Sequence, residues 1–316
     1  MEVSYAPVVG RFAPSPTGPL HVGSLVAVVG SYLMAKREGG AWLVRMEDLD
    51  TPRVIPGMDA DILRTLEALG LLWDGEVVYQ SNRTSLYQEA LDALVERGCA
   101  YPCGCSRAEI ARISSAPHGT AGEITYPGTC RAGLAAGKPP RAIRLKVQEE
   151  PVSFSDCIHG DVSENLAETC GDFVVKRADG PFAYHLAVVV DDAAQGVTQV
   201  VRGADLLSST PRQIHLQRLL QLPSPAYCHL PLVTGPDGEK LSKRDCAVSI
   251  SAGMDLARDG SRLLREVLRF LGQNPPAVLA VSSTAEVLSW ALGSFDPSRI
   301  PTKAGALPFT PPLATR

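Results

Sequence analysis

The sequence predicts an α/β protein built around a Rossmann-like parallel sheet. Near the N-terminus a buried strand (residues 8–12), a proline- and glycine-rich turn (13–19), a helix (20–36) and a second strand (41–46) follow one another, which is how a parallel α/β unit begins. Val-rich runs typical of strands buried on both faces return after residue 172. With 316 residues, 45% of them hydrophobic, the chain is long enough for two or more domains.

Three helices are predicted in the first third of the chain. The first is marked by apolar side chains at helical spacing, namely Leu25, Val28, Val29, Tyr32 and Leu33. The second covers residues 56–69, with Pro56 in its first turn, and the third covers residues 84–97 and ends at Gly98. We therefore assign residues 1–98 to the first half of the Rossmann-like domain.

Residues 99–170 differ in composition from the segment that precedes them. They are rich in Gly, Pro and Cys, and they contain short strand candidates such as residues 142–147. Because the alternation of strand and helix resumes after them, we interpret them as an inserted subdomain.

Cysteines in this insertion predict a structural zinc site. Cys103, Cys105 and Cys130 lie close together in a segment with little apolar content, so a bound zinc ion would hold it together. The alternative is three buried free thiols. A fourth ligand is expected among Cys and His, and Cys99 and His118 are the nearest candidates. The remaining cysteines are predicted to be buried thiols: Cys157, Cys170, Cys228 and Cys246.

Sheet and helix alternate again over residues 171–250, which we assign to the second half of the Rossmann-like domain. Three strands are expected from the runs FVVKR (173–177), LAVVV (186–190) and VTQVV (197–201). A helix over residues 210–220 and a loop over 240–244 follow. Residues 251–316 are expected to form a small helical subdomain, with an amphipathic helix over 255–271 and a loosely ordered Pro-rich tail.

The first motif with chemical content is RFAPSPTGPLHVGS, from Arg11 to Ser24. Gly18 lies in a tight turn, and His21 and Gly23 lie where the helix begins. A helix N-terminus offers free backbone N–H groups and a positive dipole end, which suit a phosphate. His21 can donate a hydrogen bond there, and Gly23 lets a nucleotide approach closely. On its own, however, the motif is more simply explained as an ordinary strand-to-helix turn.

The second motif is KLSK, from Lys240 to Lys243, in the glycine-rich loop GPDGEKLSKRD. Two lysines on such a loop can neutralise the charge that develops on a triphosphate as pyrophosphate leaves. Taken alone, this motif is more simply explained as a solvated surface loop.

Taken together, in this order and on either side of an insertion, the two motifs resemble the HIGH and KMSKS signatures of class I aminoacyl-tRNA synthetases. Three further segments make the chain similar to the glutamyl-tRNA synthetase family: VRMEDLDTPR (44–53), FAYHLAVVVDD (182–192) and VRGADLLSSTPRQ (201–213). The resemblance covers about residues 8–250. It implies the fold of a class I synthetase catalytic domain and an ATP-dependent ligase.

The resemblance also implies a role for each matching residue at a glutamate site. Arg11 would bind the side-chain carboxylate of glutamate, and Glu47 would bind its ammonium group. The other implied positions are Ala13, Ser15, Tyr184 and Arg202. The chemistry agrees, because an amino acid with a second carboxylate needs a planar cation and an anion. Ordinary internal ion pairs are the alternative for Arg11, Glu47 and Arg202.

The same resemblance implies an ATP site and a catalytic set. ATP would be bound by His21, Gly23, Ser24 and Lys243, and the catalytic residues would be His21, Lys240 and Lys243. Mg²⁺ would bridge the phosphates.

Two departures from the longer enzymes make the chain similar to the glutamyl-Q tRNA(Asp) synthetase family. Ser24 replaces the second histidine of HIGH, and the segment after Lys243 is too short for an anticodon-binding region. This resemblance implies activation of glutamate without tRNA and its transfer to queuosine in the anticodon arm of tRNA(Asp). It also implies Tyr126 as the fourth zinc ligand, because that family has Cys-x-Cys followed by Tyr-x-x-x-Cys. Cys99 stays as the alternative.

Composition and charge limit where the protein can be located and how it can bind RNA. The first residues do not form a signal peptide, and the longest apolar stretch, Leu25–Met34, is too short for a membrane span, so we expect a cytoplasmic protein. We also expect a monomer. A net charge of −4 means that RNA would be bound by local basic patches. One candidate is the helix face with Arg258, Arg262, Arg265 and Arg269, although a solvated face explains these arginines equally well.

Three alternative functions stay open from the sequence. The chain could be a shortened glutamyl-tRNA synthetase that charges the acceptor end of tRNA, or a nucleotidyltransferase that forms a small-molecule adenylate. It could also be a zinc-stabilised tRNA-binding protein without catalytic activity. Pyrophosphate exchange with glutamate and no RNA present separates these alternatives.

Overall fold

The computed structural model describes residues 7–114, 125–235, 250 and 254–307. Parallel strands β1 (Val9–Phe12), β2 (Ala41–Met46) and β3 (Val78–Tyr79) form one sheet in the order β1-β2-β3. A second sheet has the order β7-β6-β10-β9, made of β6 (Val152–Asp156), β7 (Gly160–Glu164), β9 (Gln199–Gly203) and β10 (Ala226–Leu230). In it, only the β6–β7 pair is antiparallel.

The two sheets lie edge to edge. The backbone N–H of Thr198 donates to the carbonyl of Val9 at 2.9 Å, which places β9 beside β1. The strand order β3-β2-β1-β9-β10 therefore reverses between β1 and β9. In open α/β sheets, ligands bind at such a switch point, beyond the carboxyl ends of the strands.

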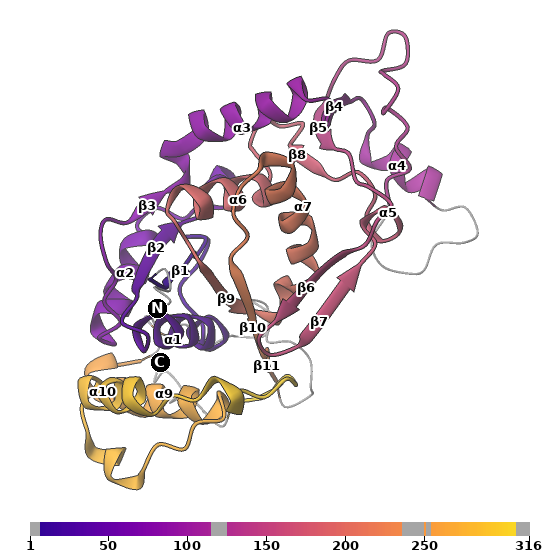
Figure 1. The fold of residues 1–316 in the computed structure, drawn as a ribbon. Coiled ribbons are helices and arrows are strands. Elements are labelled where there is room, and N and C mark those ends of the chain that lie inside the picture. Colours follow the sequence, from indigo (N-terminus) through magenta and orange to yellow (C-terminus); the bar gives the residue numbers. More distant parts are fainter. Residues whose placement is uncertain (1–6, 115–124, 236–249, 251–253, 308–316) are drawn as a thin grey trace.

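Helices cover both faces of this composite sheet (Figure 1). On one face lies α1 (Val22–Lys36), with α2 (Met58–Ala68), α9 (Leu256–Phe270) and α10 (Thr284–Ser294). On the other lie α3 (Thr84–Glu96), α6 (Tyr184–Ala194) and α7 (Thr210–Leu220). Val200 and Val201 on β9 belong to the opposite hydrophobic clusters, so this strand is buried on both faces as predicted.

Close approach of α1 to the sheet depends on Gly30. A Cβ atom at this position would lie 2.5 Å from Cδ1 of Leu230 on β10. The glycine that interrupts the apolar run of α1 therefore lets the helix pack directly on the strand.

The insertion contributes a third, antiparallel sheet. Its order is β4-β5-β8, made of β4 (Ala100–Cys103), β5 (Ala142–Leu145) and β8 (Val174–Lys176). The short helices α4 (Arg107–Ser114) and α5 (Leu166–Thr169) accompany it. In Figure 1 this part lies at the opposite end of the molecule from α9 and α10.

One predicted strand is wrong. The run LAVVV lies in helix α6, where Leu186, Ala187 and Val189 are buried against α3 and α7. A short apolar run that is buried on several sides has no period that separates helix from strand, and its three valines favoured the strand. The FVVKR run does contain a strand, β8, but it pairs with β5 of the insertion.

The C-terminal part contains a helix and a short strand that the sequence did not predict, whereas residues 308–316 of the predicted Pro-rich tail lie outside the described residues. Helix α10 begins with a capping box, in which the side chain of Ser283 accepts from the N–H of Glu286 and Glu286 accepts from Ser283. Strand β12 (Gly305–Ala306) pairs with β11 (Val233–Thr234) and ties this segment to the catalytic part.

The prediction of unpartnered thiols fails for one pair. Cys157 and Cys228 form a disulfide with their Cα atoms 4.9 Å apart. Cys157 follows β6, Cys228 lies on β10, and these two strands pair with each other. The two cysteines are therefore close because of tertiary structure, which their spacing in the sequence does not show. Cys170 is a buried thiol outside the disulfide, as predicted, whereas Cys246 lies outside the described residues.

Among the helices that the structure describes, none has the length and apolar character needed to span a membrane.

Candidate active site

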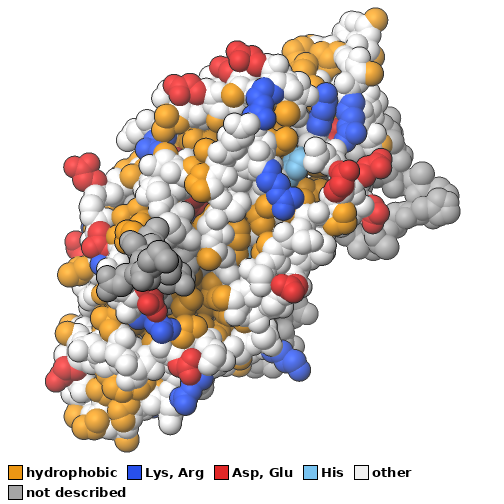
Figure 2. All heavy atoms as spheres, in the orientation of Figure 1, with side chains coloured by type: hydrophobic (Ala, Val, Ile, Leu, Met, Phe, Trp, Pro, Cys, Tyr) orange, Lys and Arg blue, Asp and Glu red, His pale blue; other side chains and the backbone are white. Residues whose placement is uncertain are grey.

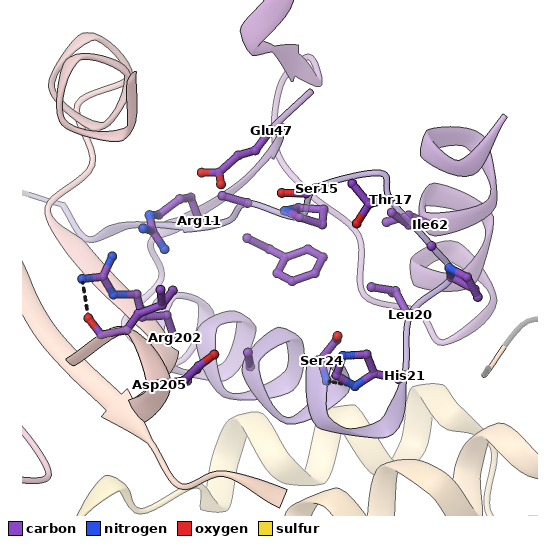
Figure 3. A pocket seen from close by; sticks show the side chains of 18 of the residues that line it. Arg11, Ser15, Thr17, Leu20, His21, Ser24, Glu47, Ile62, Arg202 and Asp205 are labelled. Atoms are coloured by element: carbon purple, nitrogen blue, oxygen red, sulfur yellow. Dashed lines mark hydrogen bonds between the residues drawn. The ribbon is translucent and has the colours of Figure 1, made fainter. Parts of the chain in front are cut away.

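A cavity of about 460 Å³ opens where the strand order reverses. It lies between the carboxyl ends of β1, β2 and β9 and the N-terminus of α1 (Figure 3). Eight of the residues predicted for the glutamate and ATP sites line it: Arg11, Ala13, Ser15, His21, Ser24, Glu47, Tyr184 and Arg202. Figure 3 shows Arg11, Glu47 and Arg202 at one end of the cavity and His21 with Ser24 at the other.

Arg11 is held in place by a carboxylate on α6. Its guanidinium Nε lies 3.3 Å from Oδ1 of Asp192, and both side chains are buried. Arg45 on β2, which is fully buried, lies 2.8 Å from the same oxygen through Nη2. Burial raises the pKa of Asp192, but the charges of Arg11 and Arg45 outweigh it and lower that pKa below its usual value. Asp192 is therefore anionic and orients Arg11 through one edge of its guanidinium.

Asp191, the neighbour of Asp192, holds the next layer of polar groups. It accepts hydrogen bonds from Gln80 at 2.8 Å, Arg83 at 2.6 Å and Tyr87 at 2.7 Å. Because the adjacent carboxylates bind different elements, the last turn of α6 fixes β1, β2 and α3 relative to one another.

Glu47 directly follows β2, and its carboxylate faces the cavity (Figure 3). Its Oε1 lies 3.7 Å from Nη2 of Arg45. Burial raises the pKa of Glu47 to about 7, because the attraction of Arg45 and Arg11 offsets only part of the desolvation and because Asp192 and Asp191 repel the charge. A cationic ligand group beside Glu47 would restore its anionic form.

Arg202 reaches the cavity from β9 beside Tyr184. Its Nη1 donates to the hydroxyl of Tyr184 at 3.3 Å. Arg11 and Arg202 are both at most 5% exposed. Two buried guanidinium groups and one carboxylate at the same end of the cavity suit a zwitterion that carries an additional carboxylate.

The other end of the cavity is the capped N-terminus of α1. His21 is the N-cap residue, and its Nδ1 accepts from the N–H of Ser24 at 3.2 Å. In the neutral imidazole, Nε2 then carries the proton and can donate to an anion. At Gly23 a Cβ atom would lie 3.1 Å from the His21 ring, so the glycine makes room for this ring. The arrangement suits a phosphate group.

The KLSK residues Lys240 and Lys243 lie outside the described residues, as does the zinc-ligand candidate His118. Their predicted roles stay predictions.

Several residues of this site were missed by sequence reasoning. Asp192 and Arg45 hold the Arg11 side, and Asp205 lines the cavity. All three lie in the segments that carried the family resemblance, where a charged residue within or directly after an apolar run was the available signal.

A second cluster lies in the insertion, where three thiols surround a phenol. The Sγ atoms of Cys103 and Cys105 lie 3.3 and 3.7 Å from the hydroxyl of Tyr126, and those of Cys105 and Cys130 lie 3.6 Å apart. Thiolates on a tetrahedral zinc, with Zn–S bonds of about 2.3 Å, are roughly 3.8 Å apart. The cluster therefore has the size and donor atoms of a metal site.

Cys99, the alternative fourth ligand, lies apart from this cluster. Its Sγ contacts the carbonyl of Arg97 at 3.7 Å, and its side chain packs against the α3–α6 hydrophobic cluster. The guanidinium of Arg144 lies over the Tyr126 ring, 3.8 Å from its centre, and helps to orient the phenol toward the thiols.

The basic face predicted on α9 is only partly available. Arg265 is buried and bonds the carbonyl of Ala280 at 3.4 Å through Nη2. Arg258 and Arg262 lie 2.8 and 3.6 Å from Asp259.

On the face drawn in Figure 2, Lys and Arg side chains gather over α3, β4 and β5, with Asp and Glu side chains among them.

Comparison with known proteins agrees with this geometry. Residues 7–291 match the family of class I tRNA synthetases for Glu and Gln, catalytic domain. The chain is 66% identical over 305 residues to a glutamyl-Q tRNA(Asp) synthetase of Geobacter sulfurreducens, covering 96% of this chain and 97% of that protein. It is 54% identical to the one of Thiobacillus denitrificans, covering 94% and 96% of the two chains.

Solved structures give the same fold. A glutamate tRNA ligase from Elizabethkingia meningosepticum, crystallised in complex with its amino acid, superposes with a TM-score of 0.79 at 27% identity. The match covers 96% of this chain and 67% of the ligase. The chain therefore belongs to the class I Glu and Gln tRNA synthetases and, within them, to the glutamyl-Q tRNA(Asp) synthetases.

Proposed function

We propose that the chain activates glutamate with ATP and transfers it to queuosine in tRNA(Asp). One observation carries the proposal: a single cavity has two buried arginines and the carboxylate of Glu47 at one end and a histidine-capped helix N-terminus at the other. Such a cavity would hold the carboxylate of an acidic amino acid against the α-phosphate of a nucleotide, which is the geometry that adenylate formation needs. Activation takes place without tRNA in this proposal.

In the proposed complex, Arg11 binds the side-chain carboxylate of glutamate and Glu47 binds its ammonium group. Ala13, Ser15, Tyr184 and Arg202 complete the pocket. Because Asp192 occupies the Nε edge of Arg11, the Nη groups are directed to the ligand. Glutamate then lies with its α-carboxylate toward His21.

At the phosphate end, His21 donates to ATP from Nε2, while Gly23 and Ser24 border the nucleotide. Mg²⁺ accompanies the triphosphate, and Lys240 and Lys243 neutralise the charge as pyrophosphate leaves. The glutamate carboxylate attacks the α-phosphate, and a hydroxyl of queuosine then attacks the mixed anhydride and releases AMP. A cytoplasmic monomer that binds the anticodon arm completes the proposal.

The insertion belongs to this proposal as a zinc-stabilised subdomain. Cys103, Cys105 and Cys130 would hold one zinc ion, with Tyr126 as the oxygen ligand, and the ion would be structural. We also propose a division of the chain at residues 98, 170 and 250. The β6–β10 and β5–β8 pairs mean that the insertion shares sheets with the part of the catalytic domain that follows it, residues 171–250.

The transfer step is tested with labelled glutamate and two RNAs, tRNA(Asp) that carries queuosine and the same tRNA without it. We expect label on the first RNA only. Label on tRNA(Glu) and on neither form of tRNA(Asp) would make the chain a conventional glutamyl-tRNA synthetase. Absence of pyrophosphate exchange with glutamate would contradict adenylate formation itself.

Glutamate binding is expected to weaken as the pH falls through about 7. Burial raises the pKa of Glu47 to about 7 in the empty site, and only the carboxylate form binds an ammonium group. The KM for glutamate should therefore level off above about pH 8 and rise about tenfold between pH 8 and pH 6, as the anionic fraction of Glu47 falls. Pyrophosphate exchange at saturating ATP measures it.

Glu47→Gln provides the matched control for this pH dependence. The amide keeps the shape but cannot titrate, so the KM for glutamate should be high at every pH and nearly independent of pH. A wild-type KM that does not change between pH 6 and pH 8 would contradict the assignment of the ammonium site to Glu47.

A further inference from the structure

A buried chain of polar side chains crosses three neighbouring strands behind the cavity. Asp156 ends β6, His229 lies on β10, and Arg202 lies on β9 as the register partner of His229. Oδ2 of Asp156 lies 2.6 Å from Nδ1 of His229, and the Nε of Arg202 lies 3.0 Å from Nε2 of the same ring. All three side chains are at most 5% exposed.

The hydrogen bonds of His229 to Asp156 and Arg202 determine which of its ring nitrogens carries the proton. The Nε of Arg202 is always a donor, so Nε2 of His229 must accept and carries a lone pair. Nδ1 therefore holds the proton and donates it to Asp156. Burial lowers the pKa of His229 and outweighs the attraction of Asp156, which agrees with a neutral ring.

Asp156 is built to stay anionic at this position. Its Oδ1 accepts backbone N–H groups from Ile158 and His159, both at 3.0 Å, and from His229 at 3.3 Å. Burial alone raises the pKa of Asp156, but these hydrogen bonds and the one from the His229 ring lower it to about 2. The carboxylate thus enforces one tautomer of His229 over the whole physiological pH range.

Most of the N–H groups of Arg202 donate to neighbouring protein atoms. Besides Nε to His229, its Nη2 donates to Thr210 Oγ1 at 2.8 Å and to the carbonyl of Leu206 at 3.3 Å. Nη1 donates to Tyr184 at 3.3 Å. Of the five N–H groups of a guanidinium, four thus have acceptors among the described residues, and the fifth is on Nη1, the end beside Tyr184 in the cavity lining.

We propose that His229 and Asp156 are positioning residues, which fix the guanidinium of Arg202 so that its Nη1 end meets glutamate. The proposal rests on the function proposed above, because it takes Arg202 as part of the glutamate site. Neither residue touches the ligand. Asp156 fixes the tautomer of His229, and the Nε2 lone pair of His229 then fixes the plane of the guanidinium.

Two amide substitutions at His229, each of which replaces one ring nitrogen, separate positioning from simple packing. In His229→Gln the terminal amide falls near Nε2, so its oxygen can accept from Arg202. In His229→Asn the amide falls near Nδ1, so it keeps the contact with Asp156 and loses Arg202. We expect His229→Asn to raise the KM for glutamate about tenfold to a hundredfold, with the KM for ATP unchanged, and His229→Gln to stay within about threefold of wild type.

Melting temperature is measured for each variant, since His229 is fully buried. A packing role would make the glutamate KM follow the loss of stability, with both amides equally harmful, and would overturn the proposal. Asp156→Asn is the second probe, because it keeps the shape of the carboxylate but no longer enforces the tautomer. It should raise the glutamate KM without changing the ATP KM.

A double-mutant cycle makes the test specific to Arg202. In an Arg202→Ala background, adding His229→Asn should change the glutamate kcat/KM by less than about twofold, because the group that His229 positions is gone. Full additivity of the two changes would overturn the proposal. If Arg202→Ala alone leaves the glutamate KM unchanged, the assignment of Arg202 to the glutamate site fails first. If Arg202→Ala strongly raises the glutamate KM but His229→Asn does not, the positioning role of His229 is refuted while Arg202 stays assigned to the glutamate site.

Discussion

We expect Arg11→Met to lower kcat/KM for glutamate by roughly a thousandfold while the protein stays folded. Methionine keeps much of the buried volume and removes the guanidinium that would pair with the side-chain carboxylate. The fold should tolerate the change, because Asp192 keeps its second partner, Arg45, at 2.8 Å. Pyrophosphate exchange with glutamate measures the loss, and circular dichroism measures the melting temperature.

The specificity of Arg11→Met distinguishes a lost carboxylate contact from a damaged site. Glutamine has nearly the shape of glutamate without its side-chain charge, so the variant should lose most of the preference for glutamate over glutamine. Arg37→Met serves as a control, because Arg37 pairs with Glu38 at 3.1 Å and is absent from the cavity lining. Near-normal exchange by Arg11→Met would refute the pocket assignment.

The sequence was most informative where one local pattern determined both the element and the site. Helix α7 and strand β2 have the predicted bounds, and α1 begins within two residues of the predicted start. Arg11 and Glu47 are found at the carboxyl ends of strands because a strand followed by a turn places its last residues at that edge. Motif and geometry coincide there.

Long-range partners could not be predicted in this way. Asp192 is separated from Arg11 by 181 positions and meets it only because α6 packs across β1 and β2. The contact could not be expected from the predicted strand at LAVVV, because only a helix over these residues brings Asp192 against Arg11 and Arg45. Asp156 and His229 likewise become partners only through the pairing of β6 with β10.

The metal cluster is an intermediate case. Their spacing in the sequence predicted Cys103, Cys105 and Cys130 as zinc ligands, but ligand chemistry alone favoured Cys99 or His118 as the fourth ligand. Tyr126 came from family resemblance, and the fold places its hydroxyl among the thiols because Tyr126 bridges to Gly171 while Cys103 ends β4. Phenols are rare enough as zinc ligands that donor chemistry by itself points elsewhere.

Loss of the metal should destabilise the insertion strongly. Among the residues of the insertion that the structure describes, the hydrophobic cluster around the site has five buried members, Tyr101, Cys103, Ile110, Tyr126 and Cys130, and three of these are candidate ligands themselves. So small a core cannot offset the conformational entropy of its own loops without a cross-link. We expect wild-type protein to contain about one zinc ion per chain, and Cys130→Ser to contain none and to melt at least about 5 °C lower.

Two variants make this expectation specific. Cys99→Ser is the matched control, because Cys99 contacts Arg97 rather than the cluster, and it should keep its zinc and its melting temperature. Tyr126→Phe keeps the ring beneath Arg144 and removes only the oxygen, so zinc affinity should fall by at least the roughly tenfold to hundredfold typical of lost supporting groups. Full zinc affinity in Tyr126→Phe would reassign the fourth position to another donor. A metal-free wild-type preparation with unchanged melting would instead remove the structural role of the ion, because the thiols alone would then suffice to hold β4 and the Cys130 loop together.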